Sequence, residues 1–253
     1  MKTKGKIILA AVAAAFALLV GAAAFVAGRY YIDNRQPNFS KDYVLYVYPE
    51  MTAAQVLDSL QAGAGTIRPK SVERVFKKME IDQNMKPGRY VVDTTVPSIY
   101  VARMLAYGWQ TAQNMTLSGT LRAKGRIAQR IGSQMLVDSA AVAQALNDEA
   151  FLAKYGFTPE NVFALILPDT YQMYWTSSIE EIFDRFKKEY DAFWTEERLA
   201  KAKAQGLNQM EVSIMASIVS GETLKEFEYP IIAGVYLNRY KKGMKLQADP
   251  TIA

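Results

Sequence analysis

The sequence contains neither histidine nor cysteine. Nucleophiles that depend on them, such as Ser-His-Asp and Cys-His sites, are therefore excluded, and so are zinc sites with His or Cys ligands. Without cysteine there is also no disulfide to indicate the redox compartment. Carboxylates, lysines and tyrosines are left for acid–base chemistry, and carboxylates suit glycoside cleavage, in which a glycosidic oxygen must be protonated. We expect no metal and no organic cofactor.

A concentrated positive charge is missing from the body of the chain. The 253 residues carry a formal net charge of +5, and Lys2, Lys4 and Lys6 contribute three of these charges. The rest has no basic stripe with interleaved aromatic residues, the pattern typical of single-strand nucleic-acid binders. We therefore expect no nucleic acid as a partner. Half of the residues are hydrophobic, which is enough for one or two domains with cores of their own.

One long apolar run extends from Ile7 to Gly28 and contains no charged residue. A helix of ~20 such residues crosses a bilayer. The lysines before the run predict a short cytoplasmic tail, with the rest of the chain on the outer, periplasmic side of the cytoplasmic membrane. The alternative is a signal peptide cleaved near Ala22-Ala23-Ala24, but signal peptides have apolar cores of only about 7–15 residues. We predict a tail and uncleaved single-pass anchor at residues 1–28 and a polar tether at 29–42.

Two folded parts are predicted after the tether, and together they indicate an α+β protein. Residues 43–110 combine β-rich runs at 43–48 and 89–92 with three amphipathic helices, of which one is capped by Thr52 and another by Ser98. This small mixed unit fits a carbohydrate-binding module, a spacer or half of the catalytic fold. Residues 111–253 alternate strand-like runs with helices.

The strongest candidate for catalysis is Glu222, in a helix predicted to start at the capping box of Asn208 and Glu211. It continues an apolar stripe at helical spacing that should face the interior, formed by Val212, Met215, Ile218 and Val219. Burial disfavours the ionised form of a carboxyl group, and a general acid must keep its proton at the working pH. The alternative is a surface glutamate that only aids solubility.

Other polar residues also suggest a site. Asp169 and Asp249 lie in proline-bounded loops, where functional residues concentrate, although aspartates there commonly form Asx-turns. The Thr223 hydroxyl can orient the neighbouring carboxyl group or bond a helix carbonyl. Asn238 and Arg239 fall near a helix end, where Arg239 can hold a carboxylate of the substrate or of the protein.

Four motifs together resemble those of the endolytic murein transglycosylases, the YceG-like family. They are Pro168-Asp169-Thr170-Tyr171, Ala216-Ser217-Ile218-Val219 followed by Glu222-Thr223, Asn238-Arg239, and Leu246-Gln247-Ala248-Asp249-Pro250-Thr251. The resemblance covers nearly the whole chain after the anchor. It implies that residues 43–110 form a LysM-like subdomain and residues 111–253 a YceG-like catalytic domain. The family continues beyond the last motif with further strands, so we expect this catalytic domain to be truncated at its C-terminus.

By this resemblance, the substrate is the glycan strand of peptidoglycan. Glu222 is expected to protonate the glycosidic oxygen between N-acetylmuramic acid and N-acetylglucosamine. It then acts as base while the muramic 6-hydroxyl attacks its own anomeric carbon, which leaves a 1,6-anhydro end. The residues expected to bind substrate or shape the site are Asp169, Thr223, Asn238, Arg239, Gln247, Asp249 and Thr251. The membrane is a further partner, and cell-wall synthesis proteins are candidate partners.

The sequence departs from the family pattern at two short pairs. Ser220-Gly221 stands where the family usually has Glu-Lys before the catalytic Glu-Thr, and Ser118-Gly119 replaces a Glu-Gly pair. An acidic neighbour of Glu222 is therefore missing. Two alternatives stay open: a catalytically degenerate scaffold that binds peptidoglycan, and a hydrolytic glycosidase that uses Glu222 together with Asp249.

Overall fold

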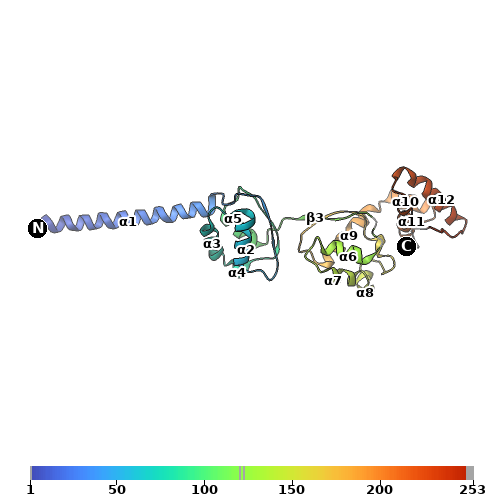
Figure 1. Cartoon of the computed structure of the whole chain (residues 1–253), viewed down its shortest axis with the longest axis horizontal. Coiled ribbons are helices and arrows are strands. Elements are labelled where there is room, and N and C mark those ends of the chain that lie inside the picture. The colour runs from blue at the N-terminus through green and yellow to red at the C-terminus, as the bar shows by residue number, and fades with distance from the viewer. Residues whose placement is uncertain (1, 120, 122, 249–253) are drawn as a thin grey trace. The chain divides into compact units, whose positions relative to one another are not determined.

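The computed structural model describes residues 2–119, 121 and 123–248. The chain forms two compact units, residues 1–112 and 113–253. Each unit combines helices with a two-stranded antiparallel sheet (Figure 1). The prediction of an α+β fold is therefore confirmed.

Helix α1 (Lys2–Arg35) contains the apolar run, and its part from Ala11 to Arg35 is long and apolar enough to cross a membrane. The helix does not end at Gly28 but continues through the first half of the segment expected to be a tether. The reason is tertiary: the Asp33 carboxylate accepts hydrogen bonds from the Arg74 guanidinium (2.5 Å) and the Ser71 hydroxyl (2.6 Å). The last turn of α1 is thus fixed to the rest of unit 1.

The sheet of unit 1 pairs β1 (Tyr43–Val47) with β2 (Gly88–Val92) along their full length. Alternate side chains of both strands are buried, because a strand turns successive side chains to opposite faces. As predicted, Thr52 caps a helix, which is α2 (Ala53–Ser59), and it does so through a capping box. The helical segments that pack around this sheet are α2 (Ala53–Ser59), the π-helical turn η1 (Leu60–Ala64), α3 (Pro69–Lys78), α4 (Ile81–Asn84) and α5 (Ser98–Tyr107).

The prediction that Ser98 caps helix α5 is wrong. Pro97 occupies the N-cap position, and Ser98 is the first helical residue. The Ser98 hydroxyl is fully buried, accepts a hydrogen bond from the Asn38 amide (2.8 Å) and pairs with the Ser71 hydroxyl (2.8 Å). A buried hydroxyl needs such partners, and here they come from segments distant in the sequence.

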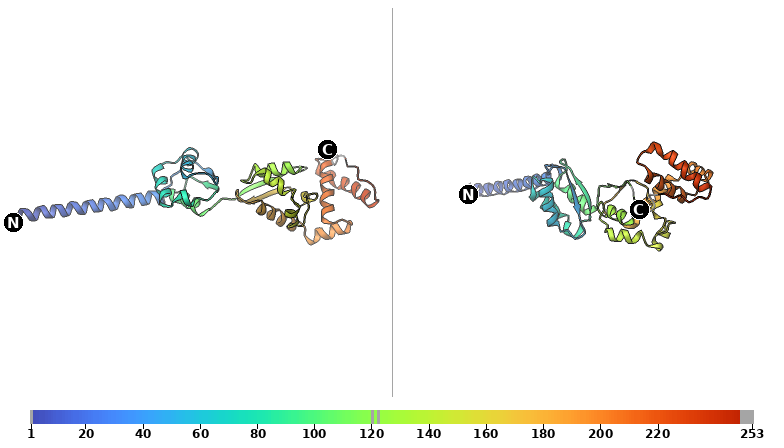
Figure 2. Two further views of the ribbon diagram at one scale, coloured as in Figure 1. Left: turned by 90° about the horizontal axis from the view of Figure 1, so that it is seen from below. Right: turned by 45° about the vertical axis from the view of Figure 1, so that its right-hand side comes forward.

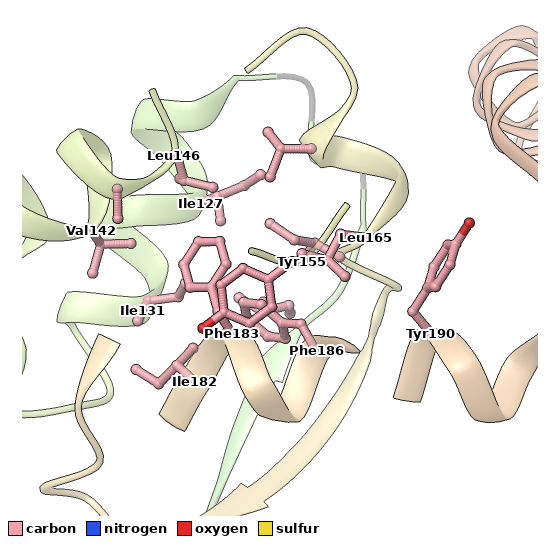
Figure 3. Close-up of a cluster of buried hydrophobic side chains, with 14 of the residues drawn as sticks. Ile127, Ile131, Val142, Leu146, Tyr155, Leu165, Ile182, Phe183, Phe186 and Tyr190 are labelled. Carbon is pink, nitrogen blue, oxygen red and sulfur yellow. The ribbon is translucent and has the colours of Figure 1, made fainter. Parts of the chain in front are cut away.

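Unit 2 is built on a sheet of β3 (Gln113–Leu117) and β4 (Asp169–Met173), which pair antiparallel. Its core is aromatic and aliphatic, and Figure 3 shows side chains from several helices converging on Phe183 and Phe186. The helical segments of this part are α6 (Lys124–Gly132), α7 (Ser139–Ala145), α8 (Glu149–Ala153), η2 (Val162–Ala164) and α9 (Ile179–Phe193).

The last helices of unit 2 have a small core of their own. The capping box of Asn208 and Glu211 starts α11, as predicted. Helices α11 and α12 pack against each other and are drawn in orange to red in Figure 2. Their common core consists of Met215, Ile218, Val219, Tyr236 and Ala248, all buried. The segments are α10 (Glu196–Ala204), α11 (Gln209–Glu222), η3 (Glu226–Glu228) and α12 (Tyr229–Lys241).

Candidate functional site

Glu222 is the last residue of α11, directly after the apolar stripe. Met215, Ile218 and Val219 are buried, as the helical spacing predicts. Glu222 itself is exposed, so the prediction that it is buried is wrong. The reason is that the helix ends at this residue and the chain turns to an extended conformation at Thr223. The stripe therefore carries the carboxyl group to the edge of the small core and not into it.

The carboxyl group of Glu222 accepts a hydrogen bond from the hydroxyl of Tyr236 on α12. Tyr236 is only 7% exposed and belongs to the small core. Its ring is therefore fixed by packing, while its hydroxyl reaches the polar edge, as buried tyrosines commonly do. Tyr236 is not among the site residues expected from the sequence. A tyrosine on an apolar helix face, whose hydroxyl needs a partner, was the available signal.

A second tyrosine–glutamate pair joins the same two helices. The Tyr240 hydroxyl donates to Oε1 of Glu211 (3.1 Å), and this bond raises the pKa of Tyr240. Tyr236 and Tyr240 are four residues apart and so lie on one face of α12. Two hydrogen bonds thus fasten α12 to α11, one near each end of α11.

The loop after α12 folds back onto the helix pair. The Arg239 guanidinium donates to the carbonyl oxygen of Leu246 and to Oε1 of Gln247, both at 2.8 Å. Gln247 has a positive φ of 54°, a conformation that is unfavourable for residues other than glycine. Ala248, next in the chain, is 3% exposed in the small core with Tyr236. Arg239 and Gln247, both predicted as site residues, are therefore brought together. The Arg239 guanidinium bonds groups of the protein itself, the Leu246 carbonyl and the Gln247 side chain.

Thr223 and Asn238 lie on the same helix pair. The Thr223 hydroxyl donates to Oε2 of Glu228 (2.6 Å) and accepts from the Lys225 backbone N–H (3.1 Å). It bonds neither the Glu222 carboxyl group nor a helix carbonyl, because α11 has already ended. Its role in this structure is to start the turn toward η3. The Asn238 side chain is exposed on α12.

Asp169 is the first residue of β4 and stands opposite Leu117 of β3. It is exposed, and its carboxylate accepts a hydrogen bond from the next backbone N–H, that of Thr170 (2.7 Å). Within residues 2–119, 121 and 123–248, no hydrogen bond or ion pair connects Asp169 to Glu222. The same residues contain no group of three or more acidic side chains that could hold a metal ion. Asp249 and Thr251 lie outside the described residues.

Comparison with known proteins relates this chain to murein-processing proteins. The YceG-like family matches residues 45–253. Two endolytic murein transglycosylases of Streptococcus pneumoniae, from strains D39 and R6, are each 23% identical over 265 aligned residues. The alignment covers 94% of this chain and 48% of each relative, so the chain spans about half the length of these curated relatives.

A solved structure shows the same fold. The crystal structure of a YceG-like protein from Listeria monocytogenes matches with a TM-score of 0.52 at 20% sequence identity. The match covers 84% of this chain and 74% of that chain. The family match includes the Glu222 helix, α12 and the loop that Arg239 holds. The chain therefore belongs to the YceG-like family.

Proposed function

We propose that this protein is a membrane-anchored endolytic lytic transglycosylase that cleaves the bond from N-acetylmuramic acid to N-acetylglucosamine in peptidoglycan. Membership of the YceG-like family and the names of the pneumococcal relatives support the substrate class. The observation that carries the mechanism is the carboxyl group of Glu222, held by the Tyr236 hydroxyl at the end of α11. Exposure of this carboxyl group leaves it open to a polymer from outside.

The proposed reaction needs one carboxyl group. Protonated Glu222 gives its proton to the glycosidic oxygen while the bond from muramic C1 to this oxygen breaks, and N-acetylglucosamine leaves with a free 4-hydroxyl. The carboxylate then takes the proton of the muramic 6-hydroxyl as O6 bonds to C1. Glu222 ends protonated, and no water is consumed. Transfer by a positioned acid–base group contributes about 10²–10⁴-fold in rate.

The remaining residues are proposed to bind the glycan or to shape its site. Exposed Gln247 and Asn238 offer amide groups near the helix pair that carries Glu222. Arg239 acts through the loop, which it fastens at two acceptors. Four further residues are proposed to bind substrate or shape the site because they lie in the family motifs: Asp169, Thr223, Asp249 and Thr251.

Helix α1 is proposed to be an uncleaved single-pass anchor that leaves both units on the outer side of the cytoplasmic membrane. Its length and apolar composition support this, and the lysines before it set the orientation. We also propose that residues 43–110 are a LysM-like subdomain, supported by the two-stranded sheet flanked by helices. Cell-wall synthesis proteins stay proposed partners.

The test is a digest of purified peptidoglycan by the full-length protein, with mass spectrometry of the released muropeptides. We expect 1,6-anhydro ends with the wild type and none with Glu222→Gln. The matched control is Glu226→Gln, an exposed glutamate on the neighbouring turn η3, which should leave the yield unchanged. Wild-type yield from Glu222→Gln would refute the assignment.

The same spectra separate the alternatives. A hydrolytic glycosidase adds water, so its reducing ends are heavier by one water than the anhydro form. A degenerate scaffold gives no new ends at all, yet the protein still sediments with insoluble sacculi. Either result would replace the proposed function.

A further inference from the structure

Unit 1 carries a group of exposed aromatic side chains that the proposed chemistry does not use. Tyr100 is 42% exposed, Tyr107 63% and Trp109 47%. The Trp109 ring centroid lies 5.5 Å from that of Tyr107 and 6.0 Å from that of Tyr100, and both pairs are tilted. The Trp109 ring thus joins the two tyrosine rings into a contiguous apolar patch, and such patches mark binding sites more often than single exposed residues do.

The backbone holds these rings in place. Helix α5 buries Val101, Ala102, Met104 and Leu105 against the core of unit 1, which leaves Tyr100 and Tyr107 on the outer face. Gly108 ends the helix with a φ of +67°, a conformation that suits glycine. The Trp109 backbone N–H then donates to the Met104 carbonyl (2.9 Å), so the indole folds back onto the helix end. The rings are thus presented by a rigid element.

Two cations border the rings. Arg103 is exposed and lies between Tyr100 and Tyr107 at helical spacing. The Lys86 backbone N–H donates a hydrogen bond to the Leu105 carbonyl (2.9 Å), and the Lys86 side chain lies beside Gly108. Among the described residues, neither side chain has an ion-pair partner. The surface therefore offers apolar ring faces together with two uncompensated positive charges.

We propose that Tyr100, Tyr107 and Trp109, with Lys86 and Arg103, form an accessory binding site for the peptidoglycan glycan strand. A pyranose ring presents a face of C–H groups that packs on an aromatic face, whose electron density attracts them. The muramic lactyl and peptide carboxylates would meet the two cations. The proposal rests on the proposed function only for the identity of the polymer, since the site itself lies in the unit without Glu222.

A membrane surface is the other partner that exposed tyrosine and tryptophan suit. The position of the rings within unit 1 argues against it. Pro97, before α5, pairs with Pro37, just after α1, so α5 begins where α1 ends. Tyr100 lies in the first turn of α5, but Tyr107 ends the helix and Trp109 follows it, about 15 Å away at 1.5 Å per residue. Tyr107 and Trp109, which carry most of the patch, therefore lie away from the end of the proposed anchor.

Intrinsic fluorescence can test the site directly. The chain has three tryptophans, and Trp175 and Trp194 are buried, so a collisional quencher in water reports mainly on Trp109. With full-length protein in detergent micelles, we expect an N-acetylglucosamine pentamer to protect this fluorescence from acrylamide. For the protein reconstituted in phosphatidylglycerol vesicles, brominated lipid should leave it unquenched. Quenching by the lipid without protection by the sugar would assign the patch to the membrane and overturn the proposal.

Variants give the second test, by cosedimentation with insoluble sacculi. Tyr107→Ala combined with Trp109→Ala should weaken binding by at least about fivefold, because aromatic contacts contribute about 0.5–1.5 kcal/mol each. Trp109→Phe, which keeps a ring, should retain most of the affinity. The matched control is Tyr48→Ala, an exposed tyrosine of the same unit outside the patch. Unchanged thermal melting of each variant establishes that it is folded.

The two proposals can fail separately. Wild-type binding by the double variant would overturn the accessory site, whatever the digest shows. Anhydro ends from Glu222→Gln would overturn the catalytic assignment, whatever the binding shows. Binding is measured without turnover, so neither result depends on the other.

Discussion

Tyr236 on α12 donates a hydrogen bond to the carboxyl group of Glu222 at the end of α11, and a second pair repeats this arrangement further along the same helices. In the second pair, Tyr240 bonds Glu211, which belongs to the capping box of α11. Both pairs join α12 to α11, but only the first involves the residue proposed to transfer protons. The second pair is therefore a natural control for the first.

We expect Tyr236→Phe to lower the rate of anhydro-end formation by about 10- to 100-fold, because a hydrogen bond to a charged group contributes about 1.5–3 kcal/mol. The ring, and with it the packing of the small core, is retained. Initial rates of anhydro-end formation on sacculi test this.

Tyr240→Phe is the matched control and should keep a rate close to that of the wild type. Equal losses in the two variants would show that the hydrogen bonds only fasten the helices together.

Arg239→Lys should release the loop that follows α12. The planar guanidinium of arginine bonds the Leu246 carbonyl and the Gln247 side chain at the same time. Lysine keeps the positive charge, but its single ammonium group cannot reproduce this two-pronged geometry. Limited trypsin digestion at the neighbouring exposed Lys245 should become about fivefold faster, which corresponds to the loss of about 1 kcal/mol. Arg198→Lys, whose guanidinium bonds the Phe193 carbonyl elsewhere in unit 2, should leave this cleavage unchanged. An unchanged digestion rate in Arg239→Lys would show that the Arg239 hydrogen bonds do not hold this loop.

Arg74→Ala should destabilise unit 1 by about 1–3 kcal/mol, because it leaves the partly buried Asp33 carboxylate without its cation. Thermal melting of the full-length protein in detergent micelles measures the loss. Lys201→Ala breaks an exposed pair with Glu197 and should cost no more than about 0.5 kcal/mol. Equal effects of the two substitutions would mean that the end of α1 is not fixed to α3.

Alkaline pH should weaken unit 1 through Tyr90. Burial raises the pKa of Tyr90 to about 12, from a model-compound value of 10.0. Below pH 10 both the folded and the unfolded chain keep this proton, and the stability is unaffected. Between about pH 10 and 12 only the unfolded chain releases it, so the free energy of unfolding falls as pH rises.

Urea titrations at several pH values across this range measure the effect. Tyr90→Phe should lose this part of the pH dependence, although it also loses the hydrogen bond to the Lys86 carbonyl (2.8 Å) and starts from a lower stability. An unchanged alkaline slope in Tyr90→Phe would show that the tyrosine ionises equally in both states.

Elements with local signals were predictable from the sequence. The capping box of Asn208 and Glu211 marks the start of α11, and Thr52 marks the start of α2. The apolar stripe of α11 follows from helical spacing, so the burial of Met215, Ile218 and Val219 could be predicted. Each of these signals depends only on residues within a few positions of one another.

Predictions that depended on distant partners failed. Ser98 was expected to cap α5, but its hydroxyl is held by Asn38 and Ser71 from other segments. The segment after Gly28 was expected to be a tether, but the Arg74 ion pair makes its first half helical. The burial of Glu222 was inferred from its spacing alone, and the helix ends at that residue.

The sequence by itself determined the family, the α+β class, a long apolar helix near the N-terminus and the choice of Glu222 as the candidate proton donor, because composition, periodicity and motifs are written along the chain. The tertiary structure alone decided which groups meet: Tyr236 with Glu222, Arg239 with the Leu246–Gln247 loop, and Trp109 with Tyr107 and Tyr100. The first two contacts join residues whose separation in sequence carries no periodic signal, and the third needs the left-handed turn at Gly108. Such contacts form only when elements pack, because burial of apolar side chains then sets the position of the polar groups at their edge.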